Sequence, residues 1–408
     1  MQLQTVETVS VASLPILPVE SPEFWAEPER FVGPARKQHP WLARFAHGFI
    51  VHGCQANKDL MADSEHLYMG LDGLVEFYGA QGTSWARFMS EMLNSQRGAE
   101  HARIRGSVAS AFTARQANKM RTVIRQVIDE LLNEWAPKGA FDFAEFASYF
   151  PVAVMCALLG VSTEAIPRLR KSLEAQLKAI SMDRSALPDF IAGCDVIWDF
   201  ADETVRRREA GAETDGDGLL DAMIAAKTAG HLSERELRYL VMVMLFAGYD
   251  TSKNMLTMTM HLLLQLPSMY ARCAEDHEYC QRVIEEALRH SNIATPVRQV
   301  QKSFVYDGFR FPEGAIVYMA TPLAGRDPAA YSDPMVFDPD RRPETPHVAF
   351  GRGPHHCIGQ FLARTQLQEG LHAVAKRLRN PRRTGDISWR PFLGAWGLQR
   401  LPIAFDAA

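Results

Sequence analysis

The segment HVAFGRGPHHCIGQFLA (347–363) surrounds a single cysteine with glycines and histidines. Cys357 stands where a helical pattern begins, and the free N–H groups of a helix amino terminus favour a negatively charged sulfur. Glycines allow the backbone to approach a flat group without a Cβ clash. The segment therefore indicates a metal-binding thiolate, a cysteine nucleophile or a simple turn.

The number of cysteines in this segment separates the metal sites that are possible. Structural zinc sites gather four protein ligands, and iron–sulfur clusters take four thiolates, so one cysteine argues against both. Haem iron accepts a single thiolate. A nucleophilic cysteine would need a histidine base oriented by a third residue. On spacing alone, haem ligation, a nucleophile and a structural turn all stay open.

The stretch FGRGPHHCIG (350–359) resembles the haem-binding signature of the cytochrome P450 family. The resemblance implies haem b as the cofactor and Cys357 as the axial ligand of its iron. Six positions match the fixed residues of that signature: Phe350, Gly351, Gly353, His355, Cys357 and Gly359.

The stretch AGYDTS (247–252) is similar to the oxygen-activation motif of the same family. By this resemblance, Ala247 and Gly248 lie against the haem, with Gly248 making room beside the iron. Thr251 offers a hydroxyl to bound oxygen, and Asp250 supplies protons. The alternative is a buried helix in which the threonine bonds back to the preceding turn.

The stretch EALR (286–289) matches the family's E-x-x-R motif. Glu286 and Arg289 are one helical turn apart and can pair. The resemblance implies a buried pair joined by a third residue, which we expect to be Arg341, with Arg342 as the alternate. An ordinary surface pair, which stabilises little, is the other interpretation.

Four basic residues are implied as partners of the two haem propionates. His101 and Arg105 are at i and i+4 on one helical face, and the stretch 101–115 resembles the corresponding family helix. The same resemblance adds Arg298 and His355. Without it, His101 and Arg105 would be interpreted as a solvated basic face.

The elements that must position these residues are mostly helical. We expect an irregular segment over residues 1–45, a short strand at 49–51 and helices from 84 to 266, with loops at 181–188 and 210–218. Ser233 and Glu236 form a capping box, so a helix of roughly 45–50 Å should run from Ser233 to about Gln265. Another helix is expected at 278–291.

After residue 291 the pattern changes to short strands. We expect small hairpins within 297–321, turning at Asp307-Gly308 and Glu313-Gly314, an irregular meander over 327–346 and a hairpin-like tail over 387–405. The prediction is a single domain over 1–408, mainly α with minor β. Its helix-rich part is 84–291, and its sheets are near 45–52, 296–320 and 386–406. The resemblance implies the triangular-prism cytochrome P450 fold, with haem between the long central helix and the cysteine-loop helix.

Composition limits the function classes. The net charge of −4 gives no support for nucleic-acid binding. Six dispersed cysteines favour a reduced, cytoplasmic setting, and we find no signal peptide or membrane anchor. We expect a monomer. The pattern C-x₃-H-x₂-C at Cys273, His277 and Cys280 lacks a fourth zinc ligand.

The resemblance implies a monooxygenase that uses O₂ and two electrons from a ferredoxin and an NAD(P)H-dependent flavin reductase. We expect a basic patch near the thiolate to steer an acidic ferredoxin, with contributions from Arg97, Arg103, Arg115, Arg352 and Arg364, unless these are ordinary solvated arginines. A peroxide-driven hydroxylase and a haem-based sensor are the alternatives. A hydrophobic substrate (terpenoid, steroid-like or aromatic) is expected, because the pocket segments are mainly apolar. These segments include the loop 180–191. The expected pocket residues are Leu74, Phe77, Trp85, Phe246, Ala247, Thr251, Ala294, Val297, Leu393 and Trp396.

Overall fold

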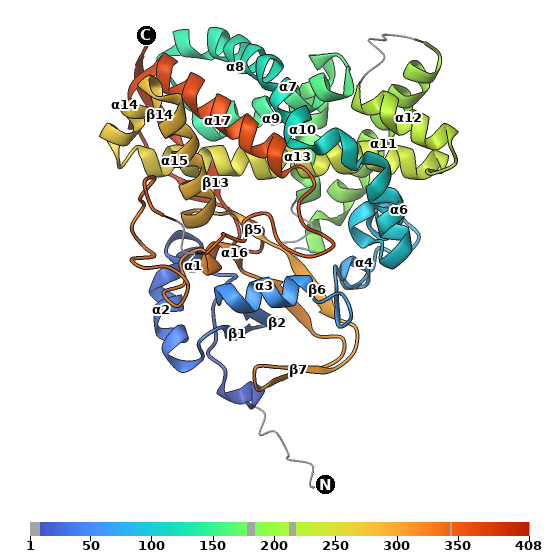
Figure 1. Cartoon of the computed structure of the whole chain (residues 1–408), viewed down its shortest axis with the longest axis vertical. Helices are drawn as coiled ribbons and strands as arrows, with labels where there is room; N and C mark the ends of the chain where they lie inside the picture. The colour runs from blue at the N-terminus through green and yellow to red at the C-terminus, as the bar shows by residue number, and fades with distance from the viewer. Residues whose placement is uncertain (1–8, 178–183, 212–217, 343–344, 408) are drawn as a thin grey trace.

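The computed structural model describes residues 9–177, 184–211, 218–342 and 345–407. The larger part of the molecule is helical, as expected (Figure 1). Its helices are α5 (Ser84–Glu91), α6 (Gly98–Ala109), α7 (Ala114–Lys119), α8 (Arg121–Trp135), α9 (Phe143–Leu159), α10 (Ile166–Leu177), α11 (Leu187–Glu209), α12 (Leu219–Thr228), α13 (Glu234–Leu263), α14 (Pro267–Glu275), α15 (His277–His290) and α17 (Gln360–Arg377). Among the described residues, no helix is long and apolar enough to cross a bilayer.

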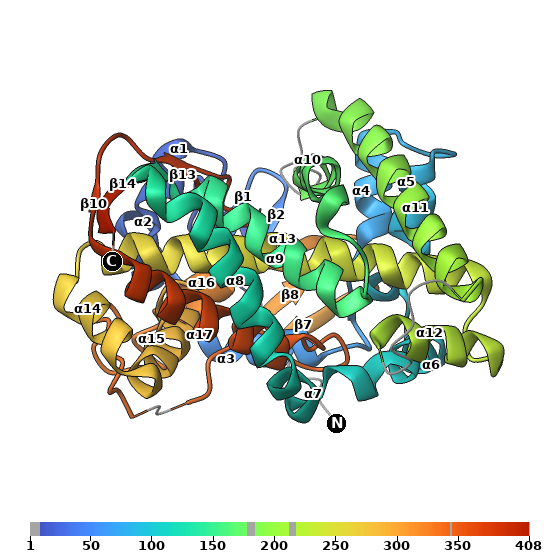
Figure 2. The same ribbon diagram turned by 90° about the horizontal axis from the view of Figure 1, so that it is seen from above.

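The long central helix is confirmed. α13 has 30 residues and crosses the whole helical layer, as Figures 1 and 2 show. The capping box starts it: Ser233 Oγ accepts from the Glu236 N–H, and Glu236 Oε2 accepts from the Ser233 N–H at 2.7 Å. The middle of α13 is buried because α9, α11 and α17 pack around it.

The amino-terminal part and the main sheet form the other side of the molecule (Figure 1). Five strands make the main sheet in the order β1-β2-β9-β6-β3. They are β1 (Leu42–Phe45), β2 (Gly48–Val51), β3 (Leu67–Tyr68), β6 (Val297–Val300) and β9 (Ile316–Met319). Short helices accompany them: α1 (Pro22–Ala26), α2 (Pro28–Gln38), α3 (Cys54–Ala62), α4 (Leu71–Tyr78) and α16 (Thr321–Ala324).

The expectation of an irregular start was wrong. Residues 22–38 form α1 and α2, each with a proline in its first turn, where the missing N–H is not needed. Pro34 lies inside α2, and the helix persists because it buries Val32 and Ala35 against the core. Burial therefore outweighs the cost of one proline here.

The hairpin predictions were partly right. Asp307 and Gly308, both with positive φ, connect β7 (Phe304–Tyr306) to β8 (Phe309–Phe311) in an antiparallel pair. The turn at 313–314 instead connects strands of different sheets, because β9 pairs with β2 and β6. Residues 327–346 contain neither helix nor strand where they are described, as predicted for the meander.

The carboxyl-terminal strands lie against the helices. β11 (Ser388–Trp389) pairs with β13 (Leu398–Arg400), and β12 (Gly394–Ala395) pairs with β5 (Ala294–Thr295). The tail is not one hairpin, since β14 (Pro402–Ala407) lies between β10 (Leu378–Arg383) and β4 (Ala140–Asp142). This arrangement brings residues near 390 onto the long helix.

Candidate active site

The cysteine loop is a tight structure stabilised by its own backbone. The Cys357 N–H donates to the Phe350 carbonyl at 2.8 Å, and Gly351 and Gly353 have φ near +70°. A Cβ on Gly353 would lie 2.7 Å from Ala62 Cα, so only glycine allows α3 to pack on the loop. α17 begins at Gln360, three residues after the cysteine and not at it. All six cysteines lie within the described ranges, and Cys357 alone among them is partly exposed.

The electrostatic setting of Cys357 leaves its thiol protonated without a further cation. Burial raises the pKa of Cys357, although the Gly359 N–H and the positive charges of Arg105 and Arg364 act in the opposite direction. A thiolate is the form that binds metal. A metal ion facing the sulfur would supply the missing positive charge.

Basic side chains gather beside the loop without acidic partners. The rings of His101 and His355 lie 4.4 Å apart, and Arg105 Nη2 donates to the His356 carbonyl at 2.7 Å. Arg298 is buried, and its described hydrogen bonds are to Met69 Sδ and the Val297 carbonyl. Across the described ranges, none of these four side chains forms an ion pair with a carboxylate.

The pKa values of Arg298 and His355 are both lowered in this setting. Burial lowers the pKa of Arg298 to about 10. Burial and then repulsion from His101, Arg298 and Arg105 lower the pKa of His355 to about 3. Two carboxylates placed among these groups would remove much of that cost. The donor set therefore fits a porphyrin that brings two propionates together with an iron ion.

The middle of α13 presents two residues on an otherwise buried helix. Ala247 and Thr251 are exposed, and their i, i+4 spacing puts them on one face. Thr251 Oγ1 donates to the Ala247 carbonyl at 2.9 Å, which is the back-bonded form considered for this residue. This stripe is where a ligand can approach the helix.

Asp250 faces a different side from Thr251 and is buried. Its Oδ1 lies 2.6 Å from Arg390 Nη1, and its Oδ2 accepts from Asn254 Nδ2 at 3.0 Å. The sequence interpretation missed both partners. The i, i+4 spacing of Asn254 was visible in the sequence, whereas Arg390 is 140 residues away and only the fold brings it close.

The role expected for Gly248 changes. A Cβ at this position would lie 2.8 Å from Met155 Sδ on α9, so the absence of a side chain here serves helix packing and does not make room at the exposed stripe. The exposed neighbour, Ala247, has the small side chain that faces outward.

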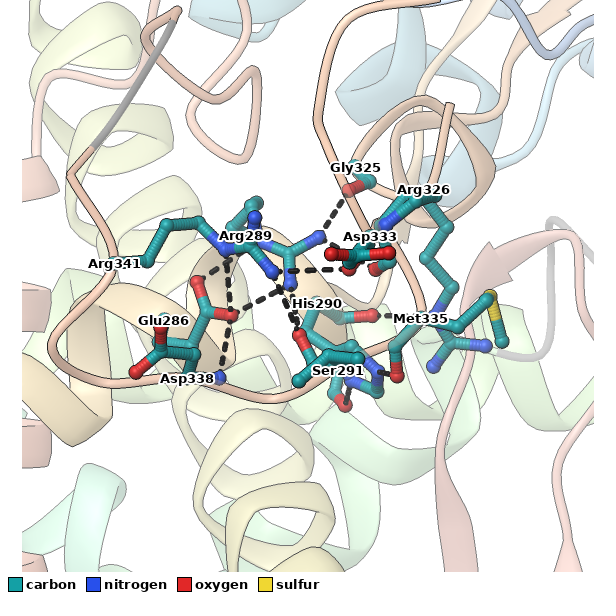
Figure 3. Close-up of polar contacts among 12 residues, drawn as sticks. Glu286, Arg289, His290, Ser291, Gly325, Arg326, Asp333, Met335, Asp338 and Arg341 are labelled. Carbon is teal, nitrogen blue, oxygen red and sulfur yellow. Dashed lines mark hydrogen bonds and ion pairs between the residues drawn. The ribbon is translucent and has the colours of Figure 1, made fainter. Parts of the chain in front are cut away.

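The E-x-x-R residues meet the meander, as Figure 3 shows. Arg289 Nη2 lies 2.6 Å from Glu286 Oε1, and Arg341 Nε lies 3.4 Å from the same oxygen. Arg289 also donates to the carbonyls of Gly325, Pro334 and Val336. The geometry matches a buried brace that includes Arg341, and Glu286 accepts the Asp338 N–H at 3.0 Å as well.

The expected pocket residues divide into two groups. Five are at least partly exposed: Phe77, Phe246, Ala247, Thr251 and Ala294. The other five are buried in the core and show no open pocket wall: Leu74, Trp85, Val297, Leu393 and Trp396. Trp85 contacts Tyr78 and Phe190, while Trp396 stacks on Trp389 and donates to the Trp25 carbonyl at 2.9 Å. Residues 180–183 of the expected pocket loop lie outside the described residues.

The cysteines near His277 belong to packed helices. Cys273 and Cys280 are buried, and His277 Nε2 lies 3.1 Å from Glu369 Oε1. In the part of the chain that the structure describes, no group of three or more His, Cys, Asp or Glu side chains could hold a metal ion.

Comparison with known proteins agrees with this geometry. Residues 81–380 match the family model described as cytochrome P450. The chain is 35% identical to luteothin monooxygenase of Streptomyces thioluteus over 405 residues, with 98% of each chain covered. It is 30% identical to 6-deoxyerythronolide B hydroxylase of Saccharopolyspora erythraea, covering 93% of this chain and 92% of that one. The solved structure of the epothilone B-bound cytochrome P450epoK superposes with a TM-score of 0.87 at 21% identity, covering 96% of this chain and all of that one.

The fold and the site therefore define a haem-thiolate protein, and the chain belongs to the cytochrome P450 family. It is an oxidoreductase of the monooxygenase class. The haem, when bound, supplies the oxygen chemistry. The chain's own residues would provide a sulfur ligand at Cys357, cations at Arg298 and Arg105, and a hydroxyl at Thr251.

Proposed function

We propose that this enzyme hydroxylates a hydrophobic metabolite. The observation that carries the proposal is the presence in one chain of three features: the partly exposed Cys357, the unpaired cations around Arg298 and the exposed stripe of Ala247 and Thr251. Haem b is the proposed form of the cofactor. The named substrates of the relatives, luteothin and 6-deoxyerythronolide B, support a metabolite substrate.

The pocket residues support an apolar substrate. Phe77, Phe246 and Ala294 are partly exposed apolar side chains, and Phe246 is adjacent to the stripe on α13. Apolar walls with few polar groups favour hydrophobic ligands. Asp250 and Thr251 are proposed to deliver protons, with the hydroxyl of Thr251 on the ligand side.

The proposed electron donor is a ferredoxin with an NAD(P)H-dependent flavin reductase. α7 packs beside α17 near the cysteine loop, and Arg115 and Arg352 are exposed there. Within the described ranges these two arginines make no ion pair, and Phe361 adds an apolar side chain that is 39% exposed. Two other arginines expected at this surface form ion pairs instead: Arg103 pairs with Glu236, and Arg364 pairs with Glu285. A small acidic ferredoxin suits the remaining surface.

The test uses the purified holoenzyme. The reduced, CO-bound absorption spectrum should show thiolate ligation, and Cys357→Ala should abolish it. A panel of polyketide, terpenoid, steroid and aromatic compounds is then screened for a spin-state shift. Compounds that bind are incubated with ferredoxin, reductase and NADPH, or with peroxide alone.

Product formed only with the electron-transfer chain supports the proposal. Product formed with peroxide alone would favour a peroxide-driven hydroxylase. Ligand binding without any product under either condition would favour a haem-based sensor and overturn the proposed monooxygenase reaction of this chain.

A further inference from the structure

One carboxyl-terminal loop, residues 390–397, contacts both the candidate substrate pocket and Asp250. Its tip includes Leu393 and β12, which pairs with Ala294 and Thr295 of β5. At its start, Arg390 Nη1 lies 2.6 Å from Asp250 Oδ1 and 3.2 Å from Asn254 Oδ1. The loop therefore connects a proposed ligand contact with the counter-ion of the acid.

The two ends of the loop are joined to each other and rest on α13. The Arg390 N–H donates to the Gly397 carbonyl at 2.9 Å, and the rings of Trp389 and Trp396 stack at its base, 5.5 Å apart. A Cβ on Gly397 would lie 3.1 Å from Asn254 Cβ, so the base of the loop rests directly on α13. Only residues 391–393 separate Arg390 from β12, and Phe392 and Leu393 are buried in the core, so a shift of β12 would also displace Arg390.

The contacts of Asp250 show why the position of Arg390 affects proton delivery. Both carboxylate oxygens accept hydrogen bonds, one from Arg390 and one from Asn254, on the buried side of α13. Arginine does not release a proton in proteins, so it cannot relay protons to Asp250. Asp250 can deliver a proton to Thr251 only after one of these two hydrogen bonds lengthens.

A second hydrogen-bond network lies next to Asp250 along α13. Tyr249 and Lys253 both donate to Glu174 of α10, at 2.8 and 3.1 Å. Burial opposes the charge of Arg390, but Asp250 and more weakly Tyr249 and Glu174 raise its pKa overall. Arg390 is thus a permanent cation, and it is fixed by α13 and the loop together.

We propose that Arg390 is a positioning residue that couples substrate contact to proton delivery. A hydrophobic substrate that presses on Leu393 and β12 shifts the loop and lengthens the Arg390–Asp250 contact. Asp250 then turns toward Thr251. Without substrate, Asp250 stays bound to Arg390, so NADPH is not consumed without forming product. This inference rests on the proposed hydroxylase function and adds the regulation of that site.

The test compares Arg390→Met with Arg390→Lys in the parent enzyme and in Asp250→Asn. In the parent background, Arg390→Met should raise substrate-free NADPH oxidation about fivefold or more and lower the product formed per NADPH. Arg390→Lys should restore part of the coupling, because it keeps the charge. In Asp250→Asn, the change at position 390 should have no further effect.

The control is Arg382→Met, which removes an exposed arginine paired with Asp406 at 3.3 Å and should leave coupling unchanged. A urea-unfolding double-mutant cycle of Arg390 and Asp250 must also be non-additive, and this readout does not depend on activity. If Arg390→Met does not retain haem, Arg390→Gln, which also removes the charge, carries the same comparison.

Equal, additive effects of the position-390 change in both backgrounds would overturn the inference, since Arg390 would then not act through Asp250. Unchanged substrate-free oxidation in Arg390→Met would do the same. If the parent enzyme binds ligands but forms no product, the proposed function itself fails, and that result is distinct from either of these.

Discussion

Glu286 and Arg289 form a buried ion pair, 2.6 Å between Oε1 and Nη2, that fastens the meander to α15 (Figure 3). Arg289 donates to two meander carbonyls, those of Pro334 and Val336, and to the Gly325 carbonyl just before the meander, and Glu286 accepts the Asp338 N–H. The meander leads directly into the cysteine loop. The pair therefore sets the position of Cys357 from a distance, without touching it.

Glu286→Gln should destabilise the protein strongly. The variant leaves Arg289 buried without its carboxylate, and breaking such a pair costs about 3–5 kcal/mol. Urea unfolding and the haem content of the purified protein measure the effect. The control Arg282→Ala removes a more exposed pair with Asp340 and should cost at most about 1 kcal/mol. Equal losses in both variants would contradict the brace.

Arg298→Met should have opposite effects on the two forms of the protein. The haem-free protein should gain about 2–3 kcal/mol in its free energy of unfolding, because a buried and unpaired cation is removed. The holoprotein should lose haem to an apomyoglobin acceptor faster. Arg310→Met, on the exposed side of β8, should change neither quantity. Loss of stability in the haem-free form would show that Arg298 has a structural partner.

Gly353→Ala should disturb the cysteine loop more than Gly351→Ala. Both glycines have φ near +70°, which costs an alanine about 1–2 kcal/mol. Only at Gly353 does the new Cβ also clash with backbone, at Ala62 Cα and the Met61 carbonyl. Thermal unfolding and the fraction of protein with a normal CO-bound spectrum separate the two variants. Identical behaviour would mean that α3 does not pack against the loop as described.

Thr251→Ala should retain haem and substrate affinity but uncouple the reaction. The hydroxyl on the exposed stripe is lost, so more NADPH should yield hydrogen peroxide and less should yield product. Thr251→Ser keeps a hydroxyl and serves as the control. Peroxide and product are measured per NADPH consumed. Coupling equal to that of the parent enzyme would remove Thr251 from proton delivery.

His290 should make the protein less stable in acid. Burial, followed by repulsion from Arg326 and Arg289, lowers the pKa of His290 to about 3. Below about pH 6.5 the unfolded chain takes up a proton that folded His290 does not. Stability therefore falls as the pH decreases from about 6.5 toward 3, by up to about 1.4 kcal/mol per pH unit.

His290→Gln removes this contribution. Between pH 7 and pH 5 the variant should lose about 2 kcal/mol less unfolding free energy than the parent protein. Guanidinium unfolding at both pH values measures the difference. His231→Gln, at an exposed position, should keep the parent slope. If the unfolding free energy of His290→Gln depends on pH as strongly as that of the parent protein, the acid sensitivity does not come from His290.

Local patterns in the sequence were sufficient for the features that depend on neighbouring residues. The capping box at Ser233 and the apolar run after it fixed the start and length of α13, because helix formation depends on contacts a few residues apart. The turn at Asp307-Gly308 was readable for the same reason. The glycines around Cys357 predicted a tight loop, and two of them have φ near +70° there.

Only the tertiary structure decided which distant groups meet. Arg390 reaches Asp250 across 140 residues, and Trp396 turns into the core because its N–H finds the Trp25 carbonyl. Gly248 proved to be a packing position against Met155. α2 persisted despite Pro34 because the core buries its apolar face. Burial and long-range pairing depend on the whole packed chain, so no local pattern encodes them.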